Sequence, residues 1–369
     1  MIYLDYAANT PVDDEVLNVF IDATKKYSAN PNSKHELGKQ AKDRIDAASK
    51  KIASYFNMNS EGVIYTSGSS ESNNLVIKGI AETRKKMGNK IIISAVEHSS
   101  IIAPCNYLAG LGYEICVISL TKDGIIDLEE LKKEIDDNTI LVSICSVDSE
   151  LGTIQPIKEI VNIVKNYPNA VFHTDATQAI GKVNIDYSGV DFITFAPHKF
   201  FGLNGFGVLL NINDIKIAPL IHGGKSTTIF RSGTPVIANV LALEKAFEIA
   251  INHLDERYDY NKKLNDILRN ELNKINCIHI NSPINSIPNT LNISLINKDT
   301  NNVLKRLEDN QIYLSTTTAC AIGNSPSKSV LAITGDEELA SNTLRISISY
   351  LTTEKDIYDF LKVLKEILN

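Results

Sequence analysis

The chain has 369 residues, of which 22% are charged and 43% hydrophobic, and its formal net charge is -7. A chain of this length can bury a large apolar core without disulfide staples, and its apolar fraction excludes a disordered protein. The mildly acidic balance argues against a phosphate-backbone partner, so we expect no direct contact with nucleic acid.

Composition also bears on the compartment. The first eleven residues carry Asp5 and no cationic flank ahead of an apolar core, which is unlike a signal peptide. No apolar run approaches the roughly 18 residues of a membrane span. The five cysteines form no Cys-x-x-Cys pair, and Cys116 and Cys145 lie in apolar runs typical of buried positions. We therefore expect a reduced, cytoplasmic protein with no membrane partner.

From about residue 60 to 215, short apolar runs alternate with helical patterns. Strands are expected at 62–65, 90–95, 113–120, 139–147, 170–174, 191–195 and 206–212, and helices at 71–87, 128–135 and 156–165. Continuously apolar strands separated by helices predict a mainly parallel sheet covered on both faces.

The rest of the chain has a different pattern. Long helical stretches are expected at 236–253 and 256–274, followed by strands at 290–295 and 344–348 and helices at 302–310 and 355–368. This order predicts a smaller α+β domain joined to the sheet by a long helix.

Polar residues follow four of the expected strands. They include His98, Asp175, Gln178, His198 and Lys199. Singly, each has a structural explanation, such as a helix cap for the aspartate. Open parallel sheets bind ligands outside the carboxyl ends of their strands. Polar residues after four such strands would therefore lie close together, which favours a functional site over separate structural roles.

A further segment, Thr-Ser-Gly-Ser-Ser-Glu at 66–71, follows a strand and opens a helix. Free backbone N–H groups and the hydroxyls of Ser69 and Ser70 would make this turn an anion site. The alternative is a capping box in which Ser67 or Ser70 serves the first helical turn. A Walker loop is excluded, because no Gly-Lys-Ser/Thr follows.

A phosphate-binding turn, an aspartate and a lysine together point to pyridoxal 5'-phosphate (PLP). This cofactor requires a lysine for its Schiff base, here Lys199, and an acidic partner for its pyridine nitrogen, here Asp175. The ring of His98 would stack on one face. The 24 residues from Asp175 to Lys199 leave room for one helix and one strand.

Several motifs carry a resemblance to a known family. They are Tyr-Leu-Asp-Tyr-Ala-Ala-Asn-Thr-Pro at 3–11, Thr-Ser-Gly-Ser-Ser-Glu-Ser-Asn-Asn at 66–74, Glu-His at 97–98, His-Thr-Asp-Ala-Thr-Gln at 173–178, His-Lys at 198–199 and Arg-Ser-Gly-Thr at 231–234. Over nearly its whole length the chain resembles NifS/IscS-type cysteine desulfurases, which are class V aminotransferases.

The resemblance implies an α/β fold of the fold-type-I PLP-dependent transferases. It implies a large PLP-binding domain with a mainly parallel sheet over residues 13–253. A smaller α+β domain, formed by residues 1–12 and 254–369, would carry the loop with the catalytic cysteine.

The resemblance also assigns cofactor contacts. It implies that His98 handles protons as well as stacking, that Gln178 contacts the pyridoxal oxygen, and that His198 contacts the phosphate. Thr234 would reach the phosphate in a neighbouring subunit's site, which implies a homodimer. The chain departs from the family at Ser149, where an asparagine usually lies beside the pyridoxal 3′-oxygen, and at Ala196, where a hydroxyl residue usually binds the phosphate.

The implied reaction converts L-cysteine to L-alanine and leaves a persulfide on a mobile, exposed cysteine. Cys320 fits best, because it lies in a polar, Gly/Pro-marked segment at 315–326 that is typical of a loop. Cys105 and Cys277 are weaker candidates. The family's arginine for the substrate carboxylate matches Arg345, and Asn289 resembles an asparagine near the same group.

Alternatives stay open at this point. They are a selenocysteine lyase, another class V PLP reaction such as an aminotransferase, and a homologue with low activity that binds a partner. The sulfur acceptor is expected to be a protein, either an iron–sulfur scaffold or a tRNA-thiolation protein.

Overall fold

The computed structural model describes residues 1–224, 226, 228–316 and 326–368. Its largest sheet consists of β2 (Val63–Thr66), β3 (Lys90–Ser94), β4 (Glu114–Ile118), β5 (Thr139–Ser143), β6 (Val171–Asp175), β7 (Phe192–Phe195) and β8 (Gly207–Asn211). The strand order is β2-β8-β7-β6-β5-β3-β4. Only β8 runs antiparallel to its neighbours in this sheet, so the carboxyl ends of the other strands share one edge.

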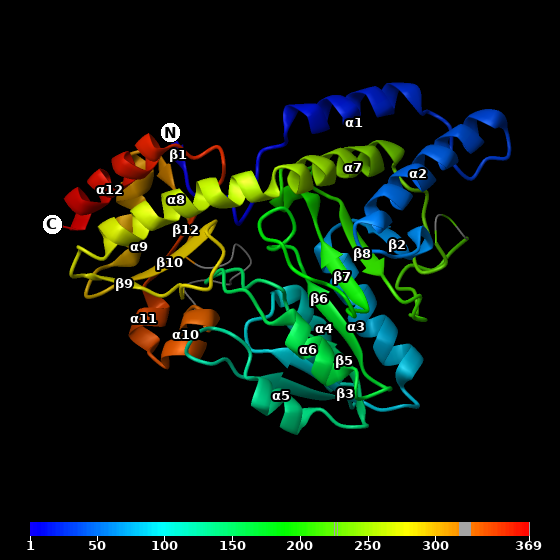
Figure 1. The fold of residues 1–369 in the computed structure, drawn as a ribbon, viewed down its shortest axis with the longest axis horizontal. Coiled ribbons are helices and arrows are strands. Elements are labelled where there is room, and N and C mark those ends of the chain that lie inside the picture. The colour runs from blue at the N-terminus through cyan, green and yellow to red at the C-terminus, as the bar shows by residue number, and fades with distance from the viewer. Residues whose placement is uncertain (225, 227, 317–325, 369) are drawn as a thin grey trace.

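Helices cover both faces of this sheet (Figure 1). One face packs against α3 (Ser69–Arg84) and α4 (Ser99–Ala109). The other packs against α1 (Asp14–Lys26), α2 (Glu36–Ser54), α5 (Leu128–Glu134), α6 (Ile157–Val164) and α7 (Ile237–Asn252). In β3 the side chains alternate between these cores, with Ile91 and Ile93 on the α3 side and Ile92 on the other. Burial on both faces explains why the strands are continuously apolar.

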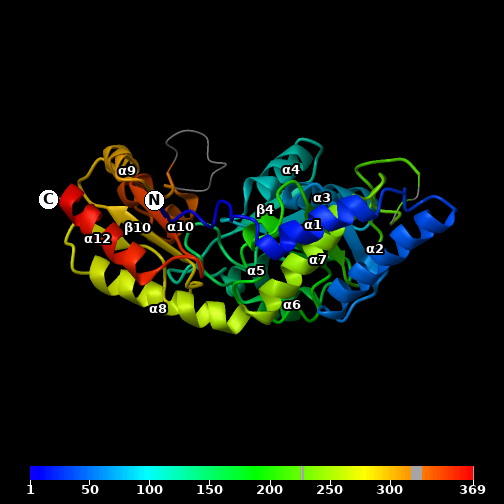
Figure 2. The same cartoon turned by 90° about the horizontal axis from the view of Figure 1, so that it is seen from above.

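A second core forms around a smaller antiparallel sheet of β9 (Ile278–Ile280), β10 (Thr290–Leu295) and β12 (Thr343–Ser347). It is packed by α8 (Leu254–Leu272), α9 (Thr300–Asp309) and α12 (Glu354–Leu368). Helix α8 follows α7 after His253 and joins the two halves of the molecule, as Figures 1 and 2 show. The short helices α10 (Lys328–Thr334) and α11 (Glu337–Ser341) lie beside this sheet.

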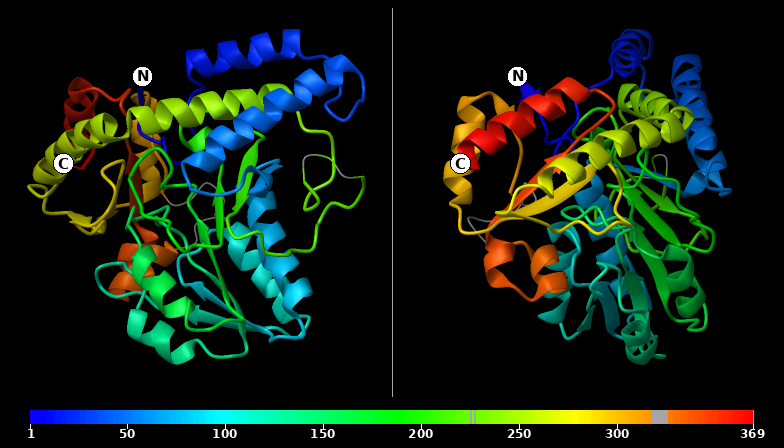
Figure 3. Two further views of the ribbon diagram at one scale, coloured as in Figure 1. Left: turned by 45° about the vertical axis from the view of Figure 1, so that its right-hand side comes forward. Right: turned by 60° about the vertical axis from the view of Figure 1, so that its left-hand side comes forward.

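The N-terminal segment belongs with the second core. Strand β1 (Ile2–Tyr3) pairs in parallel with β11 (Ile312–Tyr313), and Leu4 is buried in the same cluster as α12. The chain then crosses to α1, which lies beside α7 together with α2 (Figure 3). The domain boundaries at residues 12 and 253 stay a prediction, which these separate cores support.

The elements differ from the sequence-based expectation in several places. The strand expected at 139–147 ends at Ser143, where its pairing with β3 also ends. Beyond it, Ser146 N still donates to Asp175 O at 2.9 Å, and Ser146 O accepts from Gln155 N at 2.9 Å. Helices α1, α2, α4, α10 and α11 were not expected. Cys145 is buried as predicted, but Cys116 is only half-buried, so that expectation was wrong. Within the described ranges, no helix has the length and apolar character needed to cross a bilayer.

Candidate active site

A cavity of about 280 Å³ opens at the carboxyl ends of the parallel strands. Nine of the residues singled out from the sequence line it: Ser69, Ser70, His98, Ser149, Asp175, Gln178, His198, Lys199 and Arg345. They come from the ends of β3, β5, β6 and β7, from the start of α3, and from β12. The structure therefore brings together residues up to 276 positions apart, counted from Ser69 to Arg345.

Asp175 ends β6 with a buried carboxylate that is held by two donors. The amide of Asn73 donates to Oδ2 at 2.8 Å, and the backbone N–H of Thr177 donates to Oδ1 at 2.9 Å. The bond from Thr177 is the local turn contact expected of an aspartate at the end of a strand. Asp175 can therefore stabilise this turn and still face the cavity. Asn73 was not singled out, although it lies in a segment that carries the family resemblance.

Lys199 ends a 3-10 turn, η2 (Pro197–Lys199), that follows β7. Its ammonium donates to the backbone carbonyls of Ala7 at 2.9 Å and Ala8 at 2.5 Å. The N-terminal segment thus runs along the cavity. Thr10 secures it there, because its Oγ1 donates to His198 O and accepts from Phe201 N.

Two histidines line the cavity in different ways. His98 is the N-cap of α4, and its Nδ1 accepts from the backbone N–H of Ser100 at 3.2 Å, which leaves the proton of the neutral ring on Nε2. Burial lowers the pKa of His98, against the opposing effect of Asp175. Burial and the charges of Lys199 and Lys182 lower the pKa of His198 to about 4. Among the described residues, the buried Nδ1 of His198 has no hydrogen-bond partner.

The turn before α3 does not form the alternative capping box. Gly68 is the N-cap and makes no side-chain cap bond, and Ser67 instead donates its N–H to Glu71 Oε2 at 2.7 Å. Glu71 also accepts from Arg231 Nε at 2.9 Å. Ser69 and Ser70, in the first turn of α3, line the cavity at a helix N-terminus, where the helix dipole favours an anion.

Close backbone packing holds this turn in place. A Cβ at Gly207 on β8 would lie 2.4 Å from the carbonyl carbon of Gly68, so only glycine allows the strand and the turn to approach this closely.

Arg345 is the largest fully buried side chain, with 1% of its surface exposed. Its Nη2 pairs with Asp5 Oδ1 at 3.0 Å, and its Nη1 donates to Ser149 O at 3.1 Å. Within the described residues its Nε has no partner. A buried cation with spare donors on a cavity wall is suited to a carboxylate ligand.

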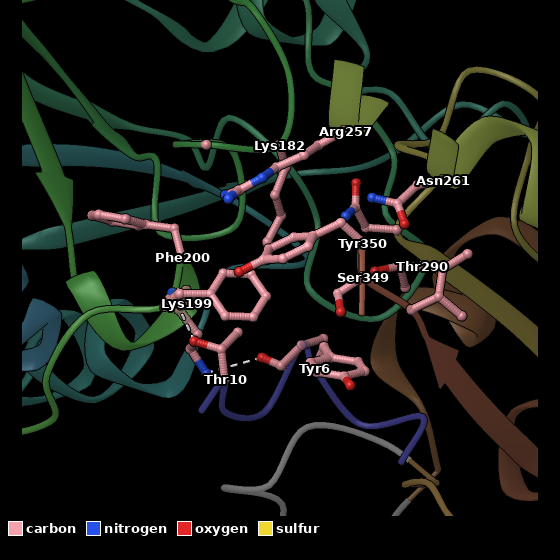
Figure 4. Close-up of a pocket in the computed structure, with 15 residues that line it drawn as sticks. Tyr6, Thr10, Lys182, Lys199, Phe200, Arg257, Asn261, Thr290, Ser349 and Tyr350 are labelled. Atoms are coloured by element: carbon pink, nitrogen blue, oxygen red, sulfur yellow. Dashed lines mark hydrogen bonds between the residues drawn. The ribbon is translucent and has the colours of Figure 1, made fainter. Parts of the chain in front are cut away.

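Two other predicted residues do not line the main cavity. Asn289 does not line the main cavity but a smaller one, drawn in Figure 4, whose wall also includes Lys199. Thr234 is exposed and does not line the main cavity. Cys320 lies outside the described residues. Of the weaker candidates, Cys105 is buried and burial raises its pKa to about 12, which opposes thiolate formation.

The residues of the main cavity fit PLP. Lys199 supplies an amine, Asp175 a carboxylate already oriented by two donors, and His98 an aromatic ring. The first turn of α3 supplies a cradle for a phosphate, and the unpartnered His198 Nδ1 is a further polar contact.

Comparison with known proteins decides the family. Residues 2–360 match the family model described as aminotransferase class-V. The chain belongs to this family. It is 37% identical to a protein named cysteine desulfurase IscS from Dictyoglomus turgidum, over 100% of this chain and 94% of that protein. It is 36% identical to a protein of the same name from Methanosarcina thermophila, over 100% of this chain and 92% of that protein.

Solved structures agree. A structure titled as a NifS-like protein superposes with a TM-score of 0.93 at 33% identity, over 100% of this chain and 99% of that one. The NifS-like protein from Rickettsia africae gives a TM-score of 0.88 at 32% identity, with the same coverage. The family resemblance and the fold-type-I architecture expected from the sequence are confirmed.

Proposed function

We propose that the protein is a PLP-dependent cysteine desulfurase that converts L-cysteine to L-alanine and transfers the sulfur to Cys320. The observation that carries this proposal is that Lys199, Asp175 and Arg345 line a single cavity. Lysine and aspartate are the two groups PLP requires, and a buried arginine beside them suits the carboxylate of an amino acid. One solved relative, 30% identical, is described as SspA in complex with cysteine, which supports cysteine as the substrate class.

The cofactor, when bound, would supply an electron sink that weakens the bonds around Cα and Cβ of the amino acid. The protein's own groups hold and orient the reactants. Lys199 would hold the cofactor, Asp175 would keep its ring nitrogen protonated, and His98 would pack on the ring with its Nε2 available for proton transfer. Ser69, Ser70 and His198 would hold the phosphate.

Substrate orientation is assigned to Arg345. Asp5 and the carbonyl of Ser149 already fix its guanidinium at 3.0 and 3.1 Å, so little side-chain entropy remains to be lost when a carboxylate binds. The contact with Ser149 uses its backbone carbonyl, so it does not depend on the serine that stands in place of the family's asparagine.

The sulfur transfer balances without an external oxidant. The Cβ–S bond of cysteine breaks, a bond forms between that sulfur and Sγ of Cys320, and Cβ takes up a proton to give alanine. The persulfide then passes to an acceptor protein, for which an iron–sulfur scaffold and a tRNA-thiolation protein are both candidates.

We further propose a cytoplasmic homodimer in which Thr234 completes the neighbouring site, since Thr234 is exposed on its own subunit.

The test is release of alanine and sulfide from L-cysteine in the presence of a thiol reductant. We expect Cys320→Ser to abolish both products, and Cys277→Ser, a matched control at a half-buried cysteine, to retain them. Undiminished product from Cys320→Ser would remove Cys320 from this role. Selenide release from selenocysteine with no alanine from cysteine would instead favour the lyase alternative.

A further inference from the structure

Lys182 is a buried lysine close to the site, and the reaction described above gives it no role. It lies between β6 and β7, only 9% exposed, on the wall of the smaller cavity beside Lys199 (Figure 4). Burying an ammonium group is costly unless it is paired. Yet no carboxylate among the described residues pairs with it. Its ammonium donates to the amide oxygen of Gln178 at 2.5 Å.

This contact fixes the orientation of the Gln178 amide. A protonated lysine can only donate hydrogen bonds, so while Lys182 carries its charge the amide oxygen must face it and the amide nitrogen must lie at the opposite end. That nitrogen donates to the carbonyl of Ala7 at 3.0 Å. Because an amide nitrogen carries two hydrogens and Gln178 lines the main cavity, one N–H is left for a ligand there.

The same carbonyl links this network to Lys199. Ala7 O accepts from Gln178 Nε2 and from Lys199 Nζ, at 3.0 and 2.9 Å. Burial, with the charges of Lys199 and Arg345, lowers the pKa of Lys182 to about 7. Lys182 can therefore influence the site through its charge as well as through its hydrogen bond to Gln178, and an experiment has to separate these two effects.

We propose that Lys182 is a positioning residue that turns the Gln178 amide so that an N–H, rather than the carbonyl oxygen, faces the cofactor's ring oxygen. The inference rests on the proposed function, because it requires PLP in the main cavity. A donor at that position stabilises the negative charge on the ring oxygen, and therefore lowers the pKa of the Lys199–cofactor linkage.

The holoenzyme is titrated with pH without substrate, and the absorbance of its visible band, at about 400 nm for a PLP–lysine linkage, is followed. The readout is the pH at which half of this absorbance change has occurred. We expect Lys182→Met and Gln178→Met each to raise this midpoint by about one pH unit, the equivalent of one hydrogen bond to a charged oxygen. The double variant should match Gln178→Met alone. The other charged groups around the linkage, Asp175, His98, His198 and Arg345, are the same in all variants.

Lys90→Met is the matched control. Lys90 is also a buried lysine, 5% exposed, but it lies at the amino end of β3 among Glu114, Glu134 and Asp136, at the opposite edge of the sheet. Its removal should leave the midpoint unchanged. If Lys182→Met does not fold, Lys182→Gln tests the same role, because it removes the charge while an amide N–H can still donate to Gln178. Its midpoint should stay near that of wild type, and a rise of about one pH unit would overturn the positioning role.

The outcomes separate the two proposals. A wild-type protein that forms no visible band with PLP contradicts the proposed function. A normal band whose midpoint is unmoved in Lys182→Met overturns the positioning role alone. The role is also overturned if Lys182→Met raises the midpoint equally in the wild-type and Gln178→Met backgrounds, because the lysine would then act through its charge.

Discussion

Glu97 carries a carboxyl group that the fold should keep protonated at neutral pH. Its side chain is 5% exposed, between β3 and His98. Oε1 accepts from Ser94 Oγ at 2.6 Å and from Cys145 N at 2.8 Å, and Oε2 has no partner among the described residues. Burial, reinforced by the charges of Asp175 and Asp148 and opposed by those two hydrogen bonds, raises the pKa of Glu97 to about 8.

This shift makes stability depend on pH with a definite sign. The folded protein binds the proton more tightly than the unfolded chain, whose carboxyl has the ordinary pKa of 4.5. The stabilisation is therefore complete below pH 4.5 and is lost as the pH rises to about 8. The full shift corresponds to about 5 kcal/mol in the free energy of unfolding. Glu97→Gln cannot ionise and keeps the acceptor oxygen, so it should escape this loss.

The assay is urea unfolding of wild type and Glu97→Gln between pH 5 and pH 8. We expect similar midpoints at pH 5 and a variant that is more stable by several kcal/mol at pH 8. Glu308→Gln, which replaces an exposed carboxylate, is the matched control. Its free energy of unfolding should differ from that of wild type by the same amount at every pH. A stability difference for Glu97→Gln that stays constant over this range would refute the reasoning.

Three further variants test the cavity. Arg345→Gln removes the carboxylate fork, and steady-state kinetics should show the KM for L-cysteine rising by at least about 10-fold with a smaller change in kcat. Asp175→Asn keeps its shape but loses the charge opposite the ring nitrogen, so turnover should fall by about 100-fold or more while the melting temperature changes little. Gly207→Ala places a Cβ 2.4 Å from Gly68. It should therefore cost about 1–3 kcal/mol of stability and weaken PLP binding in a fluorescence titration, and unchanged binding would contradict the packing argument.

Much of the main sheet could be predicted, because its strands are buried on both faces and therefore read as continuous apolar runs. The site could be predicted in outline for a related reason. Parallel strands place their carboxyl ends at one edge, so His98, Asp175 and Lys199 could be grouped without knowing any contact. The overlooked helices were of two kinds: α1 has an amphipathic pattern that was available to read, whereas α4 contains Pro104, which ordinarily ends a helix.

The parts that could not be predicted depend on long-range contacts. Ala7 binds Lys199 through a backbone carbonyl from 192 residues away, and a carbonyl has no sequence signature. The contact between Lys182 and Gln178 is local, since the two lie four positions apart, but nothing in the sequence shows that this lysine is buried. Asn289 lines the smaller cavity, whose wall also includes Lys199, and its role beside the substrate carboxylate stays a prediction.

The most direct test of the account is to identify the lysine that binds the cofactor. The purified protein, loaded with PLP and reduced with borohydride, is digested and its peptides are mapped by mass spectrometry. We predict that the pyridoxyl group is attached to Lys199 alone. The account would be contradicted if the group were attached to Lys182, which contacts Gln178, or if no lysine were labelled.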